Sequence, residues 1–344
     1  GGWLLTVGYI GTLALYAYTF GIYGAAMLGT VAHNQLIQHL LESLILTIFL
    51  GVNLYGVKMA GNTEDVIVLI KVLILLLFAG VGLFHVKADH LSPLFNHGGI
   101  NVLMGATLIF VAYEGFELIP NVVNEMKNPG RDLTRGIWVS IGLTMLIYIL
   151  VSLVAVGNLT SVEINKFKEY ALAVAAKPFF GHAGFILIGL GALLSTASAI
   201  NATLFGAARL SMVMAQEKDL PKVFSHRERT KDIPWVSLAI ITIIAVLFAN
   251  MADLTIISSF ASSTFLLLFA AINLSALRLR GRIGIGTITP LVGLLLSSAS
   301  WLTLISYLWQ TNQQSLISIG LLYLSVIVAE LVFSKRRLLL RDGN

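Results

Sequence analysis

Long apolar segments separated by short polar loops dominate this sequence, and they restrict its fold more than any other feature. A helix needs about 20 apolar residues to cross a bilayer, with a range of about 17–25, and ten segments are at least as long as the lower limit. They cover residues 3–28, 36–57, 65–86, 100–123, 136–157, 183–210, 234–250, 255–277, 287–309 and 315–334. Charged residues make up only 11% of the chain, against roughly 25% in soluble domains. The sequence therefore predicts an all-α membrane protein with ten transmembrane helices.

The lysine and arginine residues are divided unequally between the loops. Seventeen of the 22 lie in the loops after the second, fourth, sixth and eighth segments, in the C-terminal tail or, for Arg209, at the end of the sixth segment. Because loops rich in lysine and arginine remain in the cytoplasm, we expect these loops and the tail to be cytoplasmic. Membrane topology thus accounts for the net charge of +5, which gives no reason to expect a nucleic-acid partner.

Residues typical of metal and catalytic sites are missing from the sequence pattern. The chain has no cysteine, which excludes a disulfide framework and a cysteine metal site. Its histidines do not have metal-ligand spacing, and the apolar segments contain no nucleophile–base pair or phosphate-binding loop. We therefore predict no metal, no cofactor and no enzymatic activity.

The fourth segment, residues 100–123, carries two acids at its middle, Glu114 and Glu117, with Gly115 between them and Pro120 after them. Each acid costs about 3 kcal/mol at the centre of a membrane helix. Glycine and proline weaken the backbone hydrogen bonds at the same place. Non-helical backbone survives at this depth only where it is buried in protein or lines a watery cavity. We predict a discontinuous helix, broken at about residues 112–115 and open to a ligand; a kinked helix with paired acids is the alternative.

Polar residues also interrupt the third and sixth segments. Lys71 is surrounded by aliphatic residues, and an ionisable residue inside a membrane segment indicates a functional role. The alternative is a lysine whose charged end reaches the nearby cytoplasmic surface. Ser195 and Thr196 form an adjacent pair of hydroxyls near the middle of the sixth segment, whereas we expect Ser198 to bond back to its own helix.

Three stretches of the sequence resemble a family of permeases. FVAYEGFE followed by NEMKNPGRDLTRGI is similar to the sixth transmembrane helix of the amino acid–polyamine–organocation permeases. GALLSTASAINATLFGAARLSMVMAQEKDLPKVF is similar to their eighth helix, and GWLLTVGYIGTLALYAYTFG to their third. The likeness covers nearly the whole chain, and within the family it is strongest to proton-coupled amino acid transporters of broad specificity.

This resemblance implies a LeuT-type fold, in which two inverted five-helix repeats bind substrate at the membrane midplane between broken helices 1 and 6. The ten segments would be family helices 3–12, and helices 1 and 2 would be absent through an N-terminal truncation. Residues 1–86 would then be the remainder of the first repeat and residues 100–280 the second repeat. Residues 287–344 would form two C-terminal helices and a cytoplasmic tail.

The resemblance also implies roles for individual residues. Carbonyl groups freed by the break would accept the substrate's ammonium group, and neighbouring side chains would bound a pocket for its side chain. This substrate site would consist of Phe110, Val111, Ala112, Tyr113, Glu114 and Gly115. A mobile proton on a buried lysine would replace a bound sodium ion, with two hydroxyls as partners and one acid as a pH-sensing or gating group. This proton-coupling group would consist of Lys71, Ser195, Thr196 and Glu117.

We therefore expect a secondary active transporter that moves amino acids across the plasma membrane by alternating access, coupled to protons. A polyamine or amine permease or an exchanger of the same family remains open, as does a homo-oligomer formed through the last two segments. A non-transporting remnant or accessory membrane protein is the alternative from a different class.

Single cysteines at Gly130, Lys166 and Ser225 test the predicted orientation, because the chain has no cysteine of its own. Cysteines at positions 130 and 225 should react with a membrane-impermeant thiol reagent only from the cytoplasmic side. A cysteine at position 166 should react only from outside. Labelling of position 166 from the cytoplasm, with the other two external, would show that the orientation is inverted.

Overall fold

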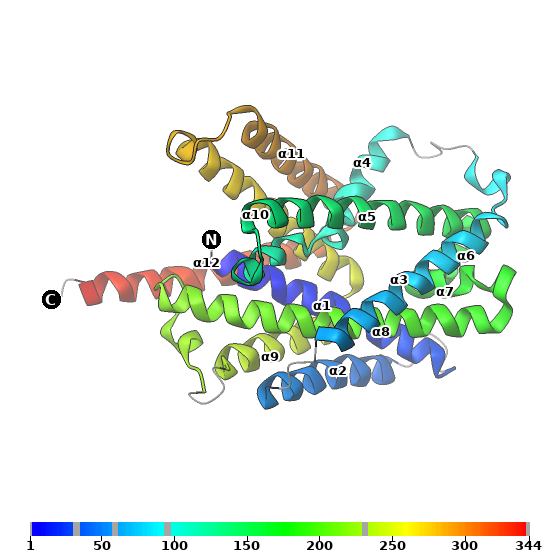
Figure 1. The fold of residues 1–344 in the computed structure, drawn as a ribbon, viewed down its shortest axis with the longest axis horizontal. Helices are drawn as coiled ribbons and strands as arrows, with labels where there is room; N and C mark the ends of the chain where they lie inside the picture. The colour runs from blue at the N-terminus through cyan, green and yellow to red at the C-terminus, as the bar shows by residue number, and fades with distance from the viewer. Residues whose placement is uncertain (1, 30–34, 57–60, 93–97, 229–232, 342–344) are drawn as a thin grey trace. The chain divides into compact units, whose positions relative to one another are not determined.

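The computed structural model describes residues 2–29, 35–56, 61–92, 98–228 and 233–341, and within them helices follow one another with short connections (Figure 1). The α-helices are α1 (Gly2–Met27), α2 (Gln35–Tyr55), α3 (Gly61–Leu83), α4 (Gly99–Leu108), α5 (Pro129–Asn158), α6 (Ser161–Phe167), α7 (Ala171–Ala175), α8 (Lys177–Gln216), α9 (Trp235–Met251), α10 (Leu254–Ile283), α11 (Ile288–Thr311) and α12 (Gln313–Arg341). Short 3-10 helices cover Ala88–Leu91, Phe110–Tyr113, Phe116–Glu125, Lys168–Tyr170 and Lys222–Ser225.

Within the described residues, each of the ten apolar segments lies mainly on helical structure, and residue 57 of the second segment lies outside them. In the part of the chain that the structure describes, eight helices are long and apolar enough to cross a membrane. The number of candidate membrane spans rises to nine if α4 and the 3-10 helices after it form one bent span. Helix α9 is apolar but shorter, with 17 residues. A helical, multi-pass membrane protein is therefore confirmed, whereas exactly ten crossings remain a prediction.

The helices group into two compact units. Unit 1 contains Gly1–Leu15, His97–Ala112 and Thr203–Asn344, and unit 2 contains Tyr16–Asn96 and Tyr113–Ala202. Helices α1 and α8 each contribute to both units, and the chain also passes from one unit to the other after Ala112. The division into repeats that the resemblance implies is a different one and remains a prediction.

In unit 1, α10 packs against α4, α11 and α12. Their shared apolar cluster contains Phe260 and Leu266 of α10, Leu304 and Leu308 of α11, and Ile319 of α12. Within a bilayer the packing of such side chains stabilises helix association through van der Waals contact, because lipid is as apolar as the core. Helix α10 also buries four hydroxyl residues in this unit, namely Ser259, Ser262, Ser263 and Thr264.

In unit 2, α5 packs against α3 and α7. Phe78 of α3, Val154 of α5 and Ile188 of α8 belong to its buried apolar cluster. Small residues allow the close approach of neighbouring segments: a Cβ atom added to Gly157 would lie 2.6 Å from a methyl carbon of Val86.

The connection between α5 and α6 is held by a capping box. The N–H of Glu163 donates to Thr160 Oγ1 at 3.3 Å, and the N–H of Thr160 donates to Glu163 Oε2 at 2.9 Å. Hydrogen bonds from Thr160 to the carboxylate lower the pKa of Glu163 below its ordinary value. The cap therefore stabilises the folded state when the pH is above the pKa of Glu163 in the unfolded chain. This stabilisation is lost as the pH falls through the lower pKa of Glu163 in the folded protein.

Candidate functional site at a broken membrane helix

The fourth apolar segment is interrupted as the sequence predicts, but the break begins after Leu108, a few residues before the predicted range of 112–115. Helix α4 ends at Leu108, a 3-10 turn covers Phe110–Tyr113, and a longer 3-10 helix starts at Phe116. The helical parts before and after Ile109 make a bend of 60° with each other. The tighter 3-10 geometry replaces the regular α-helical hydrogen bonds over these turns. The structure thus confirms the discontinuous helix.

Gly115 makes the turn at the downstream end of the break. Its φ of 120° is accessible to glycine but strained for residues with a Cβ atom. Its N–H donates to Glu117 Oε2 at 2.6 Å, so the side chain of Glu117 folds back over the start of the next helix. Pro120 lies inside that helix and offers no N–H for a regular ladder.

On the unit 1 side of the break, two backbone groups bind a serine of α10. The N–H of Val111 donates to Ser262 Oγ at 2.9 Å, and the Ser262 hydroxyl donates to the carbonyl oxygen of Leu108 at 3.0 Å. Beside them the ring of Phe110 packs edge-on against Phe269 of α10, with 6.0 Å between ring centroids. Val111 is buried and Ala112 is exposed, so the chain at Ala112 is accessible.

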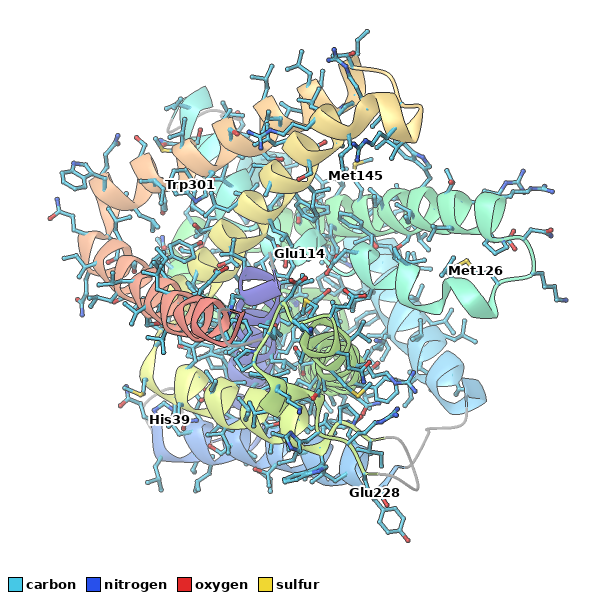
Figure 2. All side chains as sticks on the ribbon, turned by 90° about the vertical axis from the view of Figure 1, so that its left-hand side faces the viewer. His39, Glu114, Met126, Met145, Glu228 and Trp301 are labelled. Atoms are coloured by element: carbon cyan, nitrogen blue, oxygen red, sulfur yellow. The ribbon has the colours of Figure 1, made fainter. Side chains whose placement is uncertain are left out.

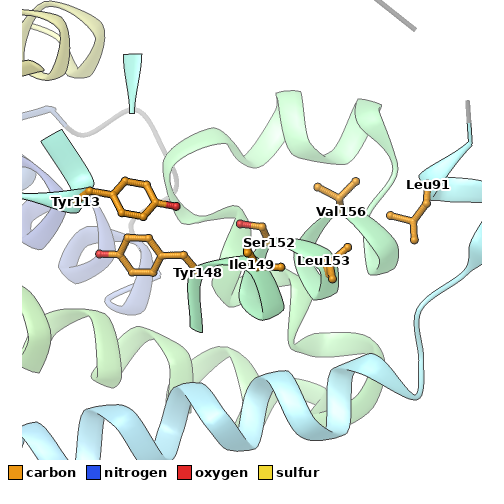
Figure 3. A pocket seen from close by; sticks show the side chains of 7 residues that line it. All are labelled: Leu91, Tyr113, Tyr148, Ile149, Ser152, Leu153 and Val156. Atoms are coloured by element: carbon orange, nitrogen blue, oxygen red, sulfur yellow. The ribbon is translucent and has the colours of Figure 1, made fainter. Parts of the chain in front are cut away.

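On the unit 2 side, the ring of Tyr113 packs edge-on against Tyr148 of α5, with 5.1 Å between ring centroids. Figure 3 shows the two rings at one end of an open groove, which continues past Ser152 and Leu153 to Leu91. Apart from the tyrosine and serine hydroxyls, the side chains that line this groove are apolar. The groove therefore starts beside the predicted site and runs along α5.

Glu114, labelled in Figure 2, has both carboxylate oxygens buried, and they make no hydrogen bond with any residue that the structure describes. It interacts electrostatically with Glu117 and with Tyr16 of α1. An ionised carboxylate removed from water is costly unless it has a counter-charge or a proton. Glu114 therefore has two acceptor oxygens available for a proton or for a cationic group.

Lys71 contacts α8 within unit 2. Its Nζ donates to Ser198 Oγ at 3.4 Å, whereas Thr196 Oγ1 donates to the carbonyl of Ala192 in its own helix at 2.8 Å. Ser195 lies three residues before Ser198 and therefore on the same side of α8. The structure brings Lys71 to the predicted helix, where Ser198 accepts its hydrogen bond, although the sequence predicts that Ser198 bonds back to its own helix. Adjacent helical residues point about 100° apart, so Ser195 and Thr196 do not share one face.

The sequence-based prediction misses several contacts, of which two lie close to the candidate site residues. Asn53 Nδ2 of α2 donates to Asn201 Oδ1 of α8 at 3.0 Å, and Ser262 binds the break as described above. Both had a signal in the sequence. Ser195, Ser198 and Asn201 recur at intervals of three residues, and α10 has five hydroxyl residues between positions 258 and 264. Over the described ranges, no group of acids and histidines is arranged to hold a metal ion.

The family model described as amino acid permease matches residues 2–330 of the chain. This chain belongs to the amino acid permease family. The predicted resemblance to the amino acid–polyamine–organocation permeases is therefore confirmed at the level of the family.

Individual relatives resemble most of the permease. It is 32% identical over 324 residues to the inner membrane transport protein YbaT of Escherichia coli, covering 92% of this chain and 74% of YbaT. It is 31% identical over 333 residues to the uncharacterized protein MJ0609 of Methanocaldococcus jannaschii, covering 96% and 76% of the two chains. The serine/threonine exchanger SteT of Bacillus subtilis is 27% identical over 271 residues, covering 75% of this chain and 60% of SteT.

Gly115→Ala should destabilise the permease, because a Cβ atom at this φ is strained by about 1–3 kcal/mol. The matched control is Gly105→Ala in α4, where a Cβ atom meets nothing within 4 Å and alanine favours the helix. Thermal unfolding of the purified variants measures the difference. A Gly115→Ala variant that unfolds at the wild-type temperature would contradict the strained turn.

Proposed function

We propose that this permease is a secondary active transporter that moves amino acids across the plasma membrane by alternating access, coupled to protons. The observation that carries this proposal is the break in the fourth apolar segment, with the buried carboxylate of Glu114 inside it. Broken membrane helices present unpaired backbone groups and helix ends to a ligand, and transporters of this kind bind their substrates there. The names of two relatives, an inner membrane transport protein and a serine/threonine exchanger, support the same function.

In this proposal, the residues of the break form the substrate site, namely Phe110, Val111, Ala112, Tyr113, Glu114 and Gly115. Their backbone carbonyls and the Glu114 carboxylate receive the ammonium group of the amino acid, because both are hydrogen-bond acceptors. The side chains of Phe110 and Val111 bound the space for the substrate's side chain. The fold is the LeuT-type inverted repeat with ten crossings and a cytoplasmic C-terminal tail.

Lys71 is the proposed proton carrier. Its amine lies within hydrogen-bonding distance of a hydroxyl on α8, which can accept from the charged form. The protonated amine then ties α3 to α8 through Ser198, with Ser195 one turn away, and the neutral amine releases this contact. Such a difference in contacts between two states is what a coupling mechanism requires. Glu117 is the second candidate for coupling, since protonation would weaken its hold on the N–H of Gly115.

Exchange of amino acids, or transport of an amine, is the second candidate function. The exchanger SteT is named for serine and threonine, and two Arabidopsis thaliana relatives, 28–29% identical over little more than half of this chain, are named cationic amino acid transporters. A pair of acids at the break suits a substrate with a positive charge.

Uptake of radiolabelled amino acids and amines into proteoliposomes that contain the purified permease tests this function. We expect uptake of at least one amino acid, stimulated when the outside is more acidic than the inside. Stimulation by unlabelled substrate inside, without any effect of the proton gradient, would favour exchange. Transport of no compound in the panel would favour a non-transporting accessory protein.

Lys71→Ala should reduce pH-driven uptake to background while the protein remains folded and inserted, because the proposed proton carrier is then absent. Lys166→Ala, on the exposed helix α6, is the matched control and should keep the wild-type pH dependence. Uptake is compared at several external pH values, with gel filtration to verify folding. Unchanged pH-dependent uptake by Lys71→Ala would exclude Lys71 as the coupling group and leave Glu117.

A further inference from the structure

The hydroxyl of Ser262 takes the place of a backbone hydrogen bond at the break. In a continuous α-helix the carbonyl of Leu108 would accept from the N–H of Ala112, four residues later. Here the N–H of Ala112 donates to the carbonyl of Ile109 at 2.9 Å, and the carbonyl of Leu108 accepts from Ser262. The N–H of Val111 donates to the same serine oxygen. One side chain therefore satisfies a backbone donor and a backbone acceptor of the interrupted helix.

Serine is well suited to this position. A hydroxyl can donate one hydrogen bond and accept others at once, and no apolar side chain can replace it in both roles. Ser262 is 0% exposed, and α10 packs directly against α4. A backbone group without a partner is costly where water is excluded, so the conformation at Val111 depends on this hydroxyl.

Ser263, the next residue on α10, forms hydrogen bonds with α11 and α12. Ser263 Oγ accepts a hydrogen bond from Trp301 Nε1 of α11 at 2.9 Å and another from the Tyr323 hydroxyl of α12 at 2.8 Å. The Tyr323 hydroxyl also lies 3.2 Å from Thr264 Oγ1. Trp301 is labelled in Figure 2. These contacts restrain rotation of α10 about its axis at the level of Ser262, so hydrogen bonds connect α11 and α12 through α10 to the break.

We propose that Ser262 is a positioning residue of the substrate site, and that Trp301 and Tyr323 hold it in the orientation that serves the break. The proposal rests on the proposed function, because it deepens the role of the broken helix. It also gives α11 and α12 a part in shaping the site, in addition to the homo-oligomer interface that the sequence leaves open for the last two segments.

A single cysteine introduced by Val111→Cys tests the effect of Ser262 on the break without any transport measurement, because this position is buried, so that labelling requires opening of the break, and the chain has no other cysteine. Loss of the buried hydroxyl in Ser262→Ala should raise the rate of thiol labelling about tenfold, as expected for one hydrogen bond. Ser259→Ala is the matched control, since the Ser259 hydroxyl is also buried on α10 but has no hydrogen-bond partner among the described residues. It should label at the wild-type rate.

Ser262→Thr and Ser262→Val separate the hydroxyl from the size of the side chain. The two substitutions have nearly the same volume, and only threonine retains the hydroxyl, so threonine should label more slowly than valine. This pair decides the question if Ser262→Ala does not fold, which gel filtration detects. Wild-type labelling rates in the variants without the hydroxyl, or an equal increase in Ser259→Ala, would overturn the proposal.

Transport kinetics then connect the geometry to the function. Ser262→Ala should raise KM for the best substrate about tenfold, with a smaller change in the maximal rate, since the site is misplaced and the coupling groups are intact. Trp301→Phe and Tyr323→Phe should raise KM in the same direction by a smaller factor. If the wild-type protein transports nothing, the proposed function fails, while the labelling result still decides the role of Ser262.

Discussion

A backbone group at membrane depth must find its hydrogen-bond partner within the protein, and the break after Leu108 depends on this constraint. Side chains supply partners on both sides of the break. Ser262 of α10 binds the backbone on the unit 1 side, and Glu117 binds the N–H of Gly115 within unit 2. The 3-10 geometry between them reorganises the remaining bonds locally. The non-helical backbone is thus held in a specific conformation.

Three ionisable residues of the apolar segments, Lys71, Glu114 and Glu117, differ in their partners, and this separates their proposed roles. Lys71 binds a hydroxyl of α8, and Glu117 binds a backbone N–H. The carboxylate oxygens of Glu114 have no hydrogen-bond partner among the residues described. Since each such group is costly in a bilayer, a chain retains it where it meets a ligand, a proton or a counter-charge. In the proposed function, Glu114 is accordingly the group that meets a cationic ligand, whereas the other two change partner with protonation.

Much of the fold follows from local features of the sequence. The ten apolar segments coincide with helices, because the length of an apolar stretch suffices to indicate a helix in a membrane. The break could be predicted for a similar reason: Gly115, Pro120 and the two acids disfavour a regular helix at their own positions. The partners of the polar side chains could not be predicted in this way. Thr196 binds its own helix, Ser198 binds Lys71, and the hydroxyls of α10 hold the break and two neighbouring helices.

The sequence by itself determined that the protein has many membrane helices, that the fourth apolar segment is interrupted, and that the chain belongs among the permeases. These properties depend on residues within one segment or on motifs of consecutive residues. Only the tertiary structure decided which hydroxyl meets Lys71 and which side chain binds the backbone at the break. Each residue turns the helix by about 100°, so the residue that faces a neighbour depends on the rotation of the whole helix. That rotation is set by packing against other helices, which no single segment encodes.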